Sequence, residues 1–347
     1  MKEGEVGCQN PRVGTARLGK IGVVGLTGDM DRLTKRTLTE WMAGVGDPRV
    51  TLCDVAMSAG VLGGVADGAL EPQLAHYAAE HALELAVSFP KPQERQVVSR
   101  TPLFASPSLR AETVSEVGFG EAVHVYDAQD GFVRVAAARD GYLGWVPSTV
   151  LGTLPEGAHR FAGLRGHIFA EPEVAAARVA ELSYGAPLCV RAEGKGEGGG
   201  WSLVASEERG DEGYVYSSVL TSADSLEPTP EALTAFALRF LETPYVWGGV
   251  SAWGLDCSGL VQTVYGAFGV ALPRDADQQA ACGREVAPDA VRAADLLFFP
   301  GHVALALEGE RFVHANAHYM CVSVDSFSGD AYGQGLRRAL TKAVRVL

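Results

Sequence analysis

The chain has 347 residues, long enough for two or three domains with separate cores, because single cores usually stop growing well below this length. Its composition, 47% hydrophobic and 20% charged, is that of ordinary soluble globular proteins and gives no reason to expect long disordered segments. With 29 basic and 42 acidic side chains the net charge is −13, so phosphate backbones and anionic lipid surfaces would be repelled. We therefore expect no nucleic acid partner.

No segment approaches the roughly 20 consecutive apolar residues that cross a bilayer, and residues 1–14 lack the apolar core of a signal peptide. We therefore expect a cytoplasmic protein without membrane insertion. The six cysteines show no paired spacing, and a chain of this size needs no disulfide framework, so we expect reduced and mostly buried thiols. They are Cys8, Cys53, Cys189, Cys257, Cys282 and Cys321.

Residues 1–90 alternate apolar runs with helical patterns, which predicts a small α/β region. The apolar runs at 21–26 and 50–57 are typical of strands. The segments 31–43 and 73–87 are expected to be helical, since apolar residues of the second recur at three- and four-residue steps. We assign this region no function.

An internal repeat follows a linker marked by prolines at residues 90–92. Residues 116–120 resemble 181–185, which lie 65 positions later, and residues 144–151 resemble 213–220, which lie 69 positions later. The two offsets differ by four residues, which a glycine-rich hairpin loop in the second copy can accommodate at little cost.

Each copy of the repeat has about sixty residues of short alternating strands separated by turn glycines, as small β-barrels do. We therefore expect one barrel at 97–155 and another at 160–223. The run GYLGW at 141–145, with the strand that precedes it, resembles bacterial SH3-like domains. Such domains commonly precede cell-wall peptidases, so this resemblance implies a peptidase in the remaining segment, 230–347.

Cys257 stands out among the cysteines because the pattern around it predicts the start of an amphipathic helix that runs to residue 268. Backbone N–H groups and the positive end of the helix dipole favour a thiolate at that position, and the thiolate is the nucleophilic form. The neighbours Asp256, Ser258 and Gly259 are small or polar and suit an open site. We therefore predict that Cys257 is a nucleophile. An earlier helix is expected at 231–242, capped by Thr229 and Pro230.

A nucleophilic thiol needs a histidine base held by a third polar group. His302 begins one apolar strand and His314 ends the next, so an antiparallel hairpin centred on Glu308 would place the two histidines directly opposite each other. This geometry requires a loop with an odd number of residues, because a two-residue turn would put them on opposite faces. We predict that His302 takes the Cys257 proton and that His314 orients His302.

A metal site is the alternative for the same region, because His318 follows His314 by four residues and Cys321 is near. A strand does not bring residues four apart into ligand geometry as a helix does, and no carboxylate or cysteine pair completes the set. We therefore expect neither a metal nor an organic cofactor.

Six sequence blocks of the last segment resemble the NlpC family of papain-like cysteine peptidases and occur in the family's order. The resemblance implies cleavage of γ-D-glutamyl bonds to a diamino acid in peptidoglycan peptides, by a catalytic triad of Cys257, His302 and His314. Ala294 stands where the family usually has glycine, and we expect this departure to affect packing more than chemistry. The blocks are YVWGG at 245–249, DCSGLV at 256–261, LPRDADQQ at 272–279, DLLFF at 295–299, GHV at 301–303 and FVHA at 312–315.

Members of this family with preceding SH3-like domains resemble enzymes that bind the free amino end of L-Ala-γ-D-Glu peptides. The resemblance implies that Tyr142, Asp256 and Glu116 surround this amine and that Ser258 meets the substrate backbone. The chemistry agrees, since a buried ammonium needs carboxylate partners and an aromatic wall limits the length of a pocket. Tyr142 and Glu116 could equally be an ordinary barrel residue and an exposed strand charge.

The sequence therefore predicts an α+β protein with an N-terminal α/β region, two SH3-like barrels and a papain-like peptidase domain at 230–347. We expect a γ-D-glutamyl-L-diamino acid endopeptidase that recycles murein peptides with a free N-terminal L-Ala. One alternative is an envelope hydrolase that cuts intact peptidoglycan. Another is a wall-binding module whose peptidase domain is inert. The preferred diamino acid, the role of residues 1–90 and the oligomeric state are not determined by the sequence.

Overall fold

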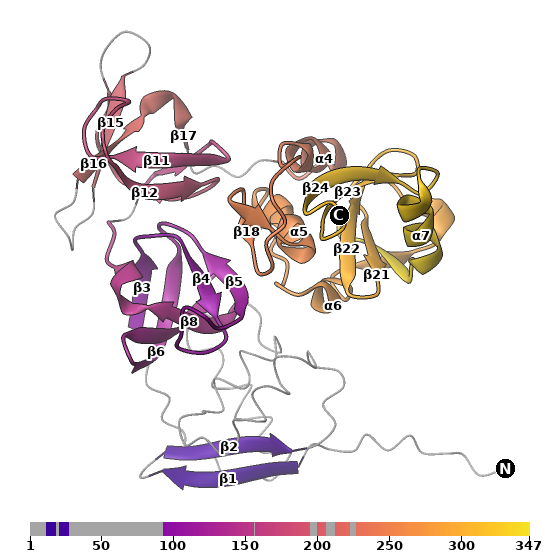
Figure 1. The fold of residues 1–347 in the computed structure, drawn as a ribbon, viewed down its shortest axis with the longest axis horizontal. Coiled ribbons are helices and arrows are strands. Elements are labelled where there is room, and N and C mark those ends of the chain that lie inside the picture. Colours follow the sequence, from indigo (N-terminus) through magenta and orange to yellow (C-terminus); the bar gives the residue numbers. More distant parts are fainter. Residues whose placement is uncertain are drawn as a thin grey trace. The chain divides into compact units, whose positions relative to one another are not determined.

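The computed structural model is composed mostly of β-strands with a few helices, and the chain divides into two compact units (Figure 1). One unit comprises Met1–Pro92 and Gly141–Leu143, and the other comprises Gln93–Asp140 and Gly144–Leu347. The structure describes residues 12–18, 21–27, 93–155, 157–194, 200–205, 212–222 and 227–347.

The N-terminal unit contains one described element pair, the antiparallel strands β1 (Arg12–Leu18) and β2 (Ile21–Thr27). β2 covers the apolar run for which we predicted a strand. The other elements predicted in this region, at 31–43, 50–57 and 73–87, lie outside the described residues, so the α/β assignment stays a prediction.

The first SH3-like domain is built on a seven-stranded sheet in the order β5-β4-β8-β7-β6-β3-β9 (Figure 1). Alternate side chains of these strands, among them Val97, Leu103, Val117 and Val135, are fully buried in a common core, as expected for strands with one face inward. The elements are β3 (Gln93–Val97), β4 (Thr101–Phe104), β5 (Thr113–Val117), β6 (Ala122–Gln129), β7 (Phe132–Ala137), β8 (Leu143–Pro147), the 3-10 helix η1 (Ser148–Val150) and β9 (Leu151–Gly152).

The second domain repeats this element order, with a five-stranded sheet β12-β11-β16-β15-β14 and a three-stranded sheet β13-β10-β17. The pairs β4·β5 and β4·β8 recur as β11·β12 and β11·β16, and η1 recurs as η3. The offset changes from 65 to 69 between β14 and β15, in the hairpin where we placed the extra residues. The elements are β10 (His159–Phe161), β11 (Arg165–Phe169), β12 (Arg178–Ser183), β13 (Pro187–Leu188), β14 (Val190–Ala192), β15 (Trp201–Ala205), β16 (Glu212–Tyr216), η3 (Ser217–Val219) and β17 (Leu220–Ser222).

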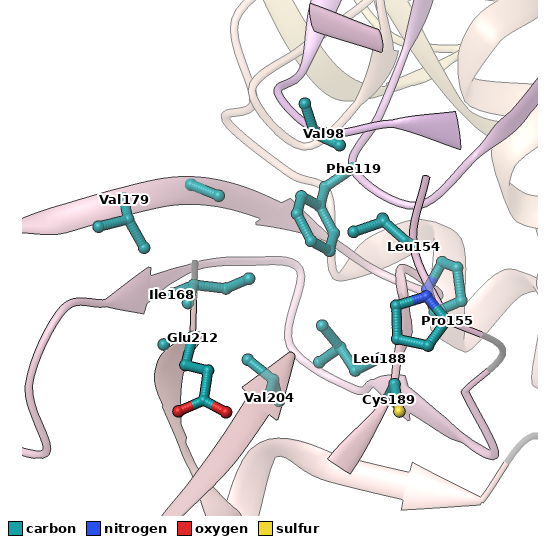
Figure 2. Close-up of a pocket in the computed structure, with 13 residues that line it drawn as sticks. Val98, Phe119, Leu154, Pro155, Ile168, Val179, Leu188, Cys189, Val204 and Glu212 are labelled. Atoms are coloured by element: carbon teal, nitrogen blue, oxygen red, sulfur yellow. The ribbon is translucent and has the colours of Figure 1, made fainter. Parts of the chain in front are cut away.

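The two SH3-like domains share apolar contacts. Phe119 of the first domain belongs to the buried core of the second, where it packs with Ile168 and Leu188. These side chains, with Val98 and Leu154, line a mainly apolar pocket, and Figure 2 shows the Phe119 ring among them. The two SH3-like domains therefore share part of a hydrophobic core. The domain boundaries themselves stay a prediction.

The C-terminal domain contains a six-stranded sheet in the order β20-β25-β21-β22-β23-β24. The helix α4 (Pro230–Leu238) is capped by the Thr229 hydroxyl as predicted but ends four residues earlier than expected. The other elements are β18 (Val250–Ser251), β19 (Gly254–Leu255), α5 (Cys257–Gly266), α6 (Ala276–Gln279), β20 (Arg284–Val286), η4 (Pro288–Ala290), β21 (Leu296–Phe299), β22 (His302–Ala306), β23 (Arg311–Asn316), β24 (Cys321–Ser326), α7 (Ala331–Ala339) and β25 (Lys342–Arg345).

Helices cover both faces of this sheet, and the strands accordingly have buried residues on both faces. Val303 and Leu305 of β22 pack in one core with Leu260 and Val264 of α5. Ala304 and its neighbours of the same parity pack in a second core, toward α7 (Figure 1). Near-continuous burial follows from this two-sided packing, and it explains the apolar runs of β21 and β22. No helix in the described part of the chain is long and apolar enough to span a membrane.

Ala294 has a backbone φ of +68°, a left-handed conformation in which glycine alone avoids the Cβ clash. We expected the alanine at this position, where the family usually has glycine, to affect packing. The structure shows that the alanine also strains the backbone. Its methyl group is buried in the core on the α5 side of the sheet.

Candidate active site

Cys257 is the first residue of α5, which confirms the helix start predicted from the sequence. The helix is capped by Asp256, whose side-chain Oδ1 accepts a hydrogen bond from the Gly259 amide at 2.8 Å. The thiol also accepts hydrogen bonds from the backbone amides of Ser258 and Val303, the residue that follows His302. This places the thiol beside the start of β22, although only 9% of Cys257 is exposed.

The electrostatic environment of the thiol differs from the expectation. Burial, followed by the negative charge of Asp256, raises the pKa of Cys257 to about 11, and the amide hydrogen bonds oppose this shift without cancelling it. Burial and the neighbouring His314 lower the pKa of His302 to about 3. Both shifts favour uncharged side chains. The helix terminus therefore does not by itself produce a resting thiolate, and proton transfer from thiol to imidazole must accompany the reaction.

The β22–β23 hairpin has the odd loop that we predicted but a different centre. Leu305 pairs with Val313 and Ala306 with Phe312, so the turn is centred on Gly309 and not on Glu308. The prediction of directly opposed histidines is therefore wrong, because a shift of one residue in the centre of the turn shifts the pairing by two residues. Gly309 adopts a φ of +72° at the centre of the turn, a conformation that glycine accepts without steric cost and Glu308 would not.

His302 and His314 nevertheless meet, because a register that is two residues off keeps them on the same face as diagonal neighbours. The Nε2 atom of His302 lies 2.8 Å from Nδ1 of His314. His302 also stacks on Phe299, which limits its ring orientations. The structure thus brings His302 and His314 together and places Cys257 beside Val303, the residue that follows His302 in β22.

Asp325 of β24 completes a chain of polar contacts that the sequence reasoning missed. Its Oδ2 lies 2.9 Å from Nε2 of His314 and accepts a hydrogen bond from the Ser323 hydroxyl at 2.9 Å. His314 is fully buried, whereas 10% of the Asp325 side chain is exposed. The alternation of Val322 and Val324 with polar residues was the available signal, but finding the partner requires the register between β23 and β24.

Asp256 is held by Arg274, a second residue to which we assigned no role from the sequence. The Arg274 guanidinium donates to both carboxylate oxygens of Asp256, at 3.0 Å for Oδ1, and to the Ser258 hydroxyl at 2.8 Å. The Gly248 amide donates to Oδ2 at 2.8 Å. Asp256 is buried, so these contacts stabilise its charge and the start of α5. Its predicted role toward a substrate amine must compete with them and stays a prediction.

Glu116 lies on β5 and is 5% exposed, so the alternative of an exposed strand charge is wrong. Its Oε2 accepts a hydrogen bond from Arg100 at 2.9 Å, whereas Oε1 has no hydrogen-bond partner among the described residues. Burial raises the pKa of Glu116, and the charge of Arg100 opposes this shift. One oxygen of this carboxylate can therefore accept a further donor, and its role toward the substrate stays a prediction.

Tyr142 lies in the segment Gly141–Leu143, which belongs to the N-terminal unit, and it is partly exposed. Its predicted proximity to the thiol is untested. Tyr245, to which we assigned no role, is in the electrostatic range of Cys257 and Asp256. Burial first, and then the proximity of Cys257 and Asp256, raise the pKa of Tyr245 to about 12, so its phenol remains a hydrogen-bond donor at neutral pH.

The region of the alternative metal site is occupied by contacts within the protein. Both ring nitrogens of His314 are engaged, with His302 and with Asp325, and the His318 ring stacks on Tyr332 at 4.1 Å. Among the described residues no group of three potential ligands has metal-binding geometry.

Known proteins resemble the chain in sequence. Residues 242–341 match the model of the NlpC/P60 family, and residues 103–151 match that of the bacterial dipeptidyl-peptidase SH3 domain. A dipeptidyl-peptidase 6 from Lysinibacillus sphaericus is 31% identical over 255 residues, which cover 69% of this chain and 94% of that protein. The chain belongs to the NlpC/P60 family. It is an NlpC/P60 cysteine peptidase with bacterial SH3-like domains.

Two further matches cover different shares of the chain. A γ-D-glutamyl-L-lysine dipeptidyl-peptidase from Bacillus subtilis is 36% identical over 112 residues, 30% of this chain and 38% of that enzyme. The crystal structure of an NlpC/P60 family protein from Bacillus cereus covers 74% of this chain and all of that chain, with a TM-score of 0.63 and 21% identity. This last likeness concerns the fold alone.

Proposed function

We propose that this NlpC/P60 peptidase hydrolyses the γ-D-glutamyl-L-diamino acid bond of short peptidoglycan-derived peptides that carry a free N-terminal L-Ala. The observation that carries the proposal is the position of β5 of the first SH3-like domain, which lies against the residues around Asp256. A relative named as a γ-D-glutamyl-L-lysine dipeptidyl-peptidase supports the choice of bond.

Contacts from the first SH3-like domain reach the start of α5 and the loop that precedes it. The Ser115 hydroxyl of β5 accepts from Nε of Arg274 at 3.2 Å, and a Cβ added at Gly248 would lie 2.6 Å from the Thr113 methyl group. Asp140 accepts a hydrogen bond from the Gln262 amide at 2.9 Å. A domain packed at this end of the site would block a continuing chain and would suit a substrate that ends there.

A substrate that ends in a free amine also suits the charges. Both candidate carboxylates are buried: Glu116 lies on β5, and Asp256 caps the start of α5. The Glu116 oxygen that has no hydrogen-bond partner among the described residues can accept an ammonium donor, and charge-assisted hydrogen bonds of this kind are about twice as strong as neutral ones. We propose that these carboxylates select the N-terminal L-Ala and that Ser258 contacts the peptide backbone.

The reaction that we propose is acyl transfer. His302 accepts the proton of Cys257 while the sulfur attacks the γ-carbonyl of D-Glu, and the backbone amide of Cys257 contributes to stabilising the oxyanion. The imidazolium then protonates the leaving amine of the diamino acid, and water hydrolyses the thioester. Because the raised pKa of Cys257 and the lowered pKa of His302 both favour uncharged side chains, the proposed mechanism couples the proton transfer to the attack on the substrate.

We place this reaction in the cytoplasm, on free peptides, as a step of murein recycling. The described cysteines other than Cys257, namely Cys189, Cys282 and Cys321, are free thiols, as is usual in a reducing compartment. The second candidate is hydrolysis of intact peptidoglycan in the envelope. The packing of the first SH3-like domain beside Asp256 argues against polymeric substrates.

The deciding assay compares L-Ala-γ-D-Glu-L-Lys with the same tripeptide acetylated at its N-terminus. We expect kcat/KM to fall by at least about 100-fold on acetylation, because the acetylated tripeptide brings no ammonium group to the buried Glu116 oxygen that has no hydrogen-bond partner among the described residues. Equal rates on both tripeptides, or faster release from purified sacculi than from the free tripeptide, would refute the proposed substrate. Cell fractionation of the native protein tests its location.

Cys257→Ala should reduce hydrolysis of the free tripeptide to background while the peptide still binds. Cys282→Ala is a matched control, since Cys282 is a half-buried free thiol whose sulfur donates a hydrogen bond to the Gln278 carbonyl at 3.4 Å. Turnover by Cys257→Ala near that of Cys282→Ala would exclude the proposed nucleophile. An inert peptidase domain would show no turnover in the unmodified protein.

A further inference from the structure

We propose that Asp325 is a positioning residue that selects the productive tautomers of both histidines. The proposal concerns the site of the proposed function and rests on its cysteine peptidase chemistry, but not on the identity of the peptide. It begins from the unbroken series of contacts that joins His302, His314 and Asp325.

Two arrangements of the ring protons are compatible with the 2.8 Å hydrogen bond between the imidazoles of His302 and His314. In the first, His302 carries its proton on Nε2 and donates it to Nδ1 of His314, so Nδ1 of His302 is free to accept the Cys257 proton. In the second, His314 carries its proton on Nδ1 and donates it to Nε2 of His302. The proton of neutral His302 is then on Nδ1, and that nitrogen is no base for the thiol. The histidine pair alone does not decide between them.

The carboxylate of Asp325 decides between them, because an ionised carboxylate only accepts hydrogen bonds. It lies 2.9 Å from Nε2 of His314, so the neutral ring must carry its proton on Nε2 to make this bond. Nδ1 of His314 is then unprotonated and accepts from Nε2–H of His302. The base on His302 is consequently Nδ1, the nitrogen that remains for the thiol.

The surroundings keep Asp325 ionised and oriented. Burial opposes its charge, but hydrogen bonds from His314 and from the Ser323 hydroxyl outweigh this effect and lower the pKa of Asp325. His318 also favours the charged carboxylate, and the phenols of Tyr319 and Tyr332 are the other titratable groups near it. Full burial of His314 prevents water from replacing Asp325 as the acceptor.

When the thiol attacks, one proton moves from Sγ of Cys257 to Nδ1 of His302, and Nδ1 later gives this proton to the leaving amine. The other two ring protons stay on Nε2 of His302 and Nε2 of His314, and the carboxylate remains ionised. Asp325 therefore acts through His314, without touching the substrate, by fixing the ring protons and by stabilising the imidazolium that forms.

Asp325→Asn tests this role, with Asp330→Asn as the matched control. Asp330 is a neighbouring carboxylate that caps α7 and contacts Tyr319, but none of its bonds joins it to His314. We expect Asp325→Asn to lower kcat for the tripeptide by about 10- to 100-fold with little change in KM. Replacing a residue that orients a functional histidine without touching the substrate typically lowers activity by this factor. Asp330→Asn should leave kcat within about twofold.

A double-mutant cycle separates this role from a structural one. In a His314→Asn background, Asp325→Asn should have almost no further effect on kcat, because the ring through which it acts is absent. An equal loss of activity in both backgrounds would overturn the proposal. Nitrogen chemical shifts of the histidine rings in the unmodified free protein give a test that needs neither a variant nor a substrate. Both His302 and His314 should carry their protons on Nε2, and a proton on Nδ1 of His314 would equally overturn it.

Discussion

Replacing Arg274 with methionine removes the cation that neutralises Asp256 at the start of α5. Only 2% of the Arg274 side chain and 8% of the Asp256 side chain are exposed, so water cannot take the place of the guanidinium. Breaking one partner of a buried ion pair costs about 3–5 kcal/mol, because the remaining charge is uncompensated. Asp256 keeps the amide bonds of Gly248 and Gly259, which argues for the lower half of this range.

Amide hydrogen exchange measures this cost where it arises. A loss of about 3–5 kcal/mol corresponds to a decrease in protection of residues 256–268 by roughly 100- to 5000-fold, since 1.4 kcal/mol is a factor of ten. The kcat for the tripeptide should fall as well, because Cys257 and Ser258 lie on the same turn. Combining the change with Asp256→Asn, which removes the uncompensated charge and keeps a capping side chain, should restore part of the protection.

Arg345→Met is the matched control for this experiment. Arg345 donates to both oxygens of Asp295, at 2.8 and 2.7 Å, and joins β25 to the start of β21 in the same domain. We expect its loss to weaken protection in those strands and to leave α5 and kcat close to those of the unmodified protein. A decrease of less than about tenfold in α5 protection for Arg274→Met, or equal kcat values for the two variants, would refute the reasoning.

Two further predictions concern His302 and Ala294. Because burial and His314 lower the pKa of His302 to about 3, the base stays neutral below its usual pKa of 6.5, and the acidic limb of kcat/KM should lie below about pH 5.5. A midpoint at or above pH 6.5 would contradict this assignment. Ala294→Gly removes a left-handed strain of about 1–2 kcal/mol and loses a buried methyl group and chain stiffness, so we expect a net stabilisation of up to about 1 kcal/mol. Calorimetry should show Tm rising by about 2–4 °C with kcat/KM unchanged, and a lower Tm would contradict the strain.

Local rules determine much of the architecture of this protein. The start of α5 at Cys257, the cap at Thr229 and the short alternating strands of the repeat depend on residues that are close in the sequence. The shared face of His302 and His314 required only the parity of one loop. These features follow from side-chain periods and capping chemistry, which a few neighbouring residues define.

The tertiary structure decided what those residues contact. Arg274 meets Ser115, which is 159 residues away, and Asp325 reaches His314 only because β24 pairs with β23 in one register. The pKa of Cys257 rises although a helix start favours a thiolate, because desolvation depends on every element packed around the sulfur. Burial and long-range ion pairs are properties of the folded chain, and no spacing in the sequence specifies them.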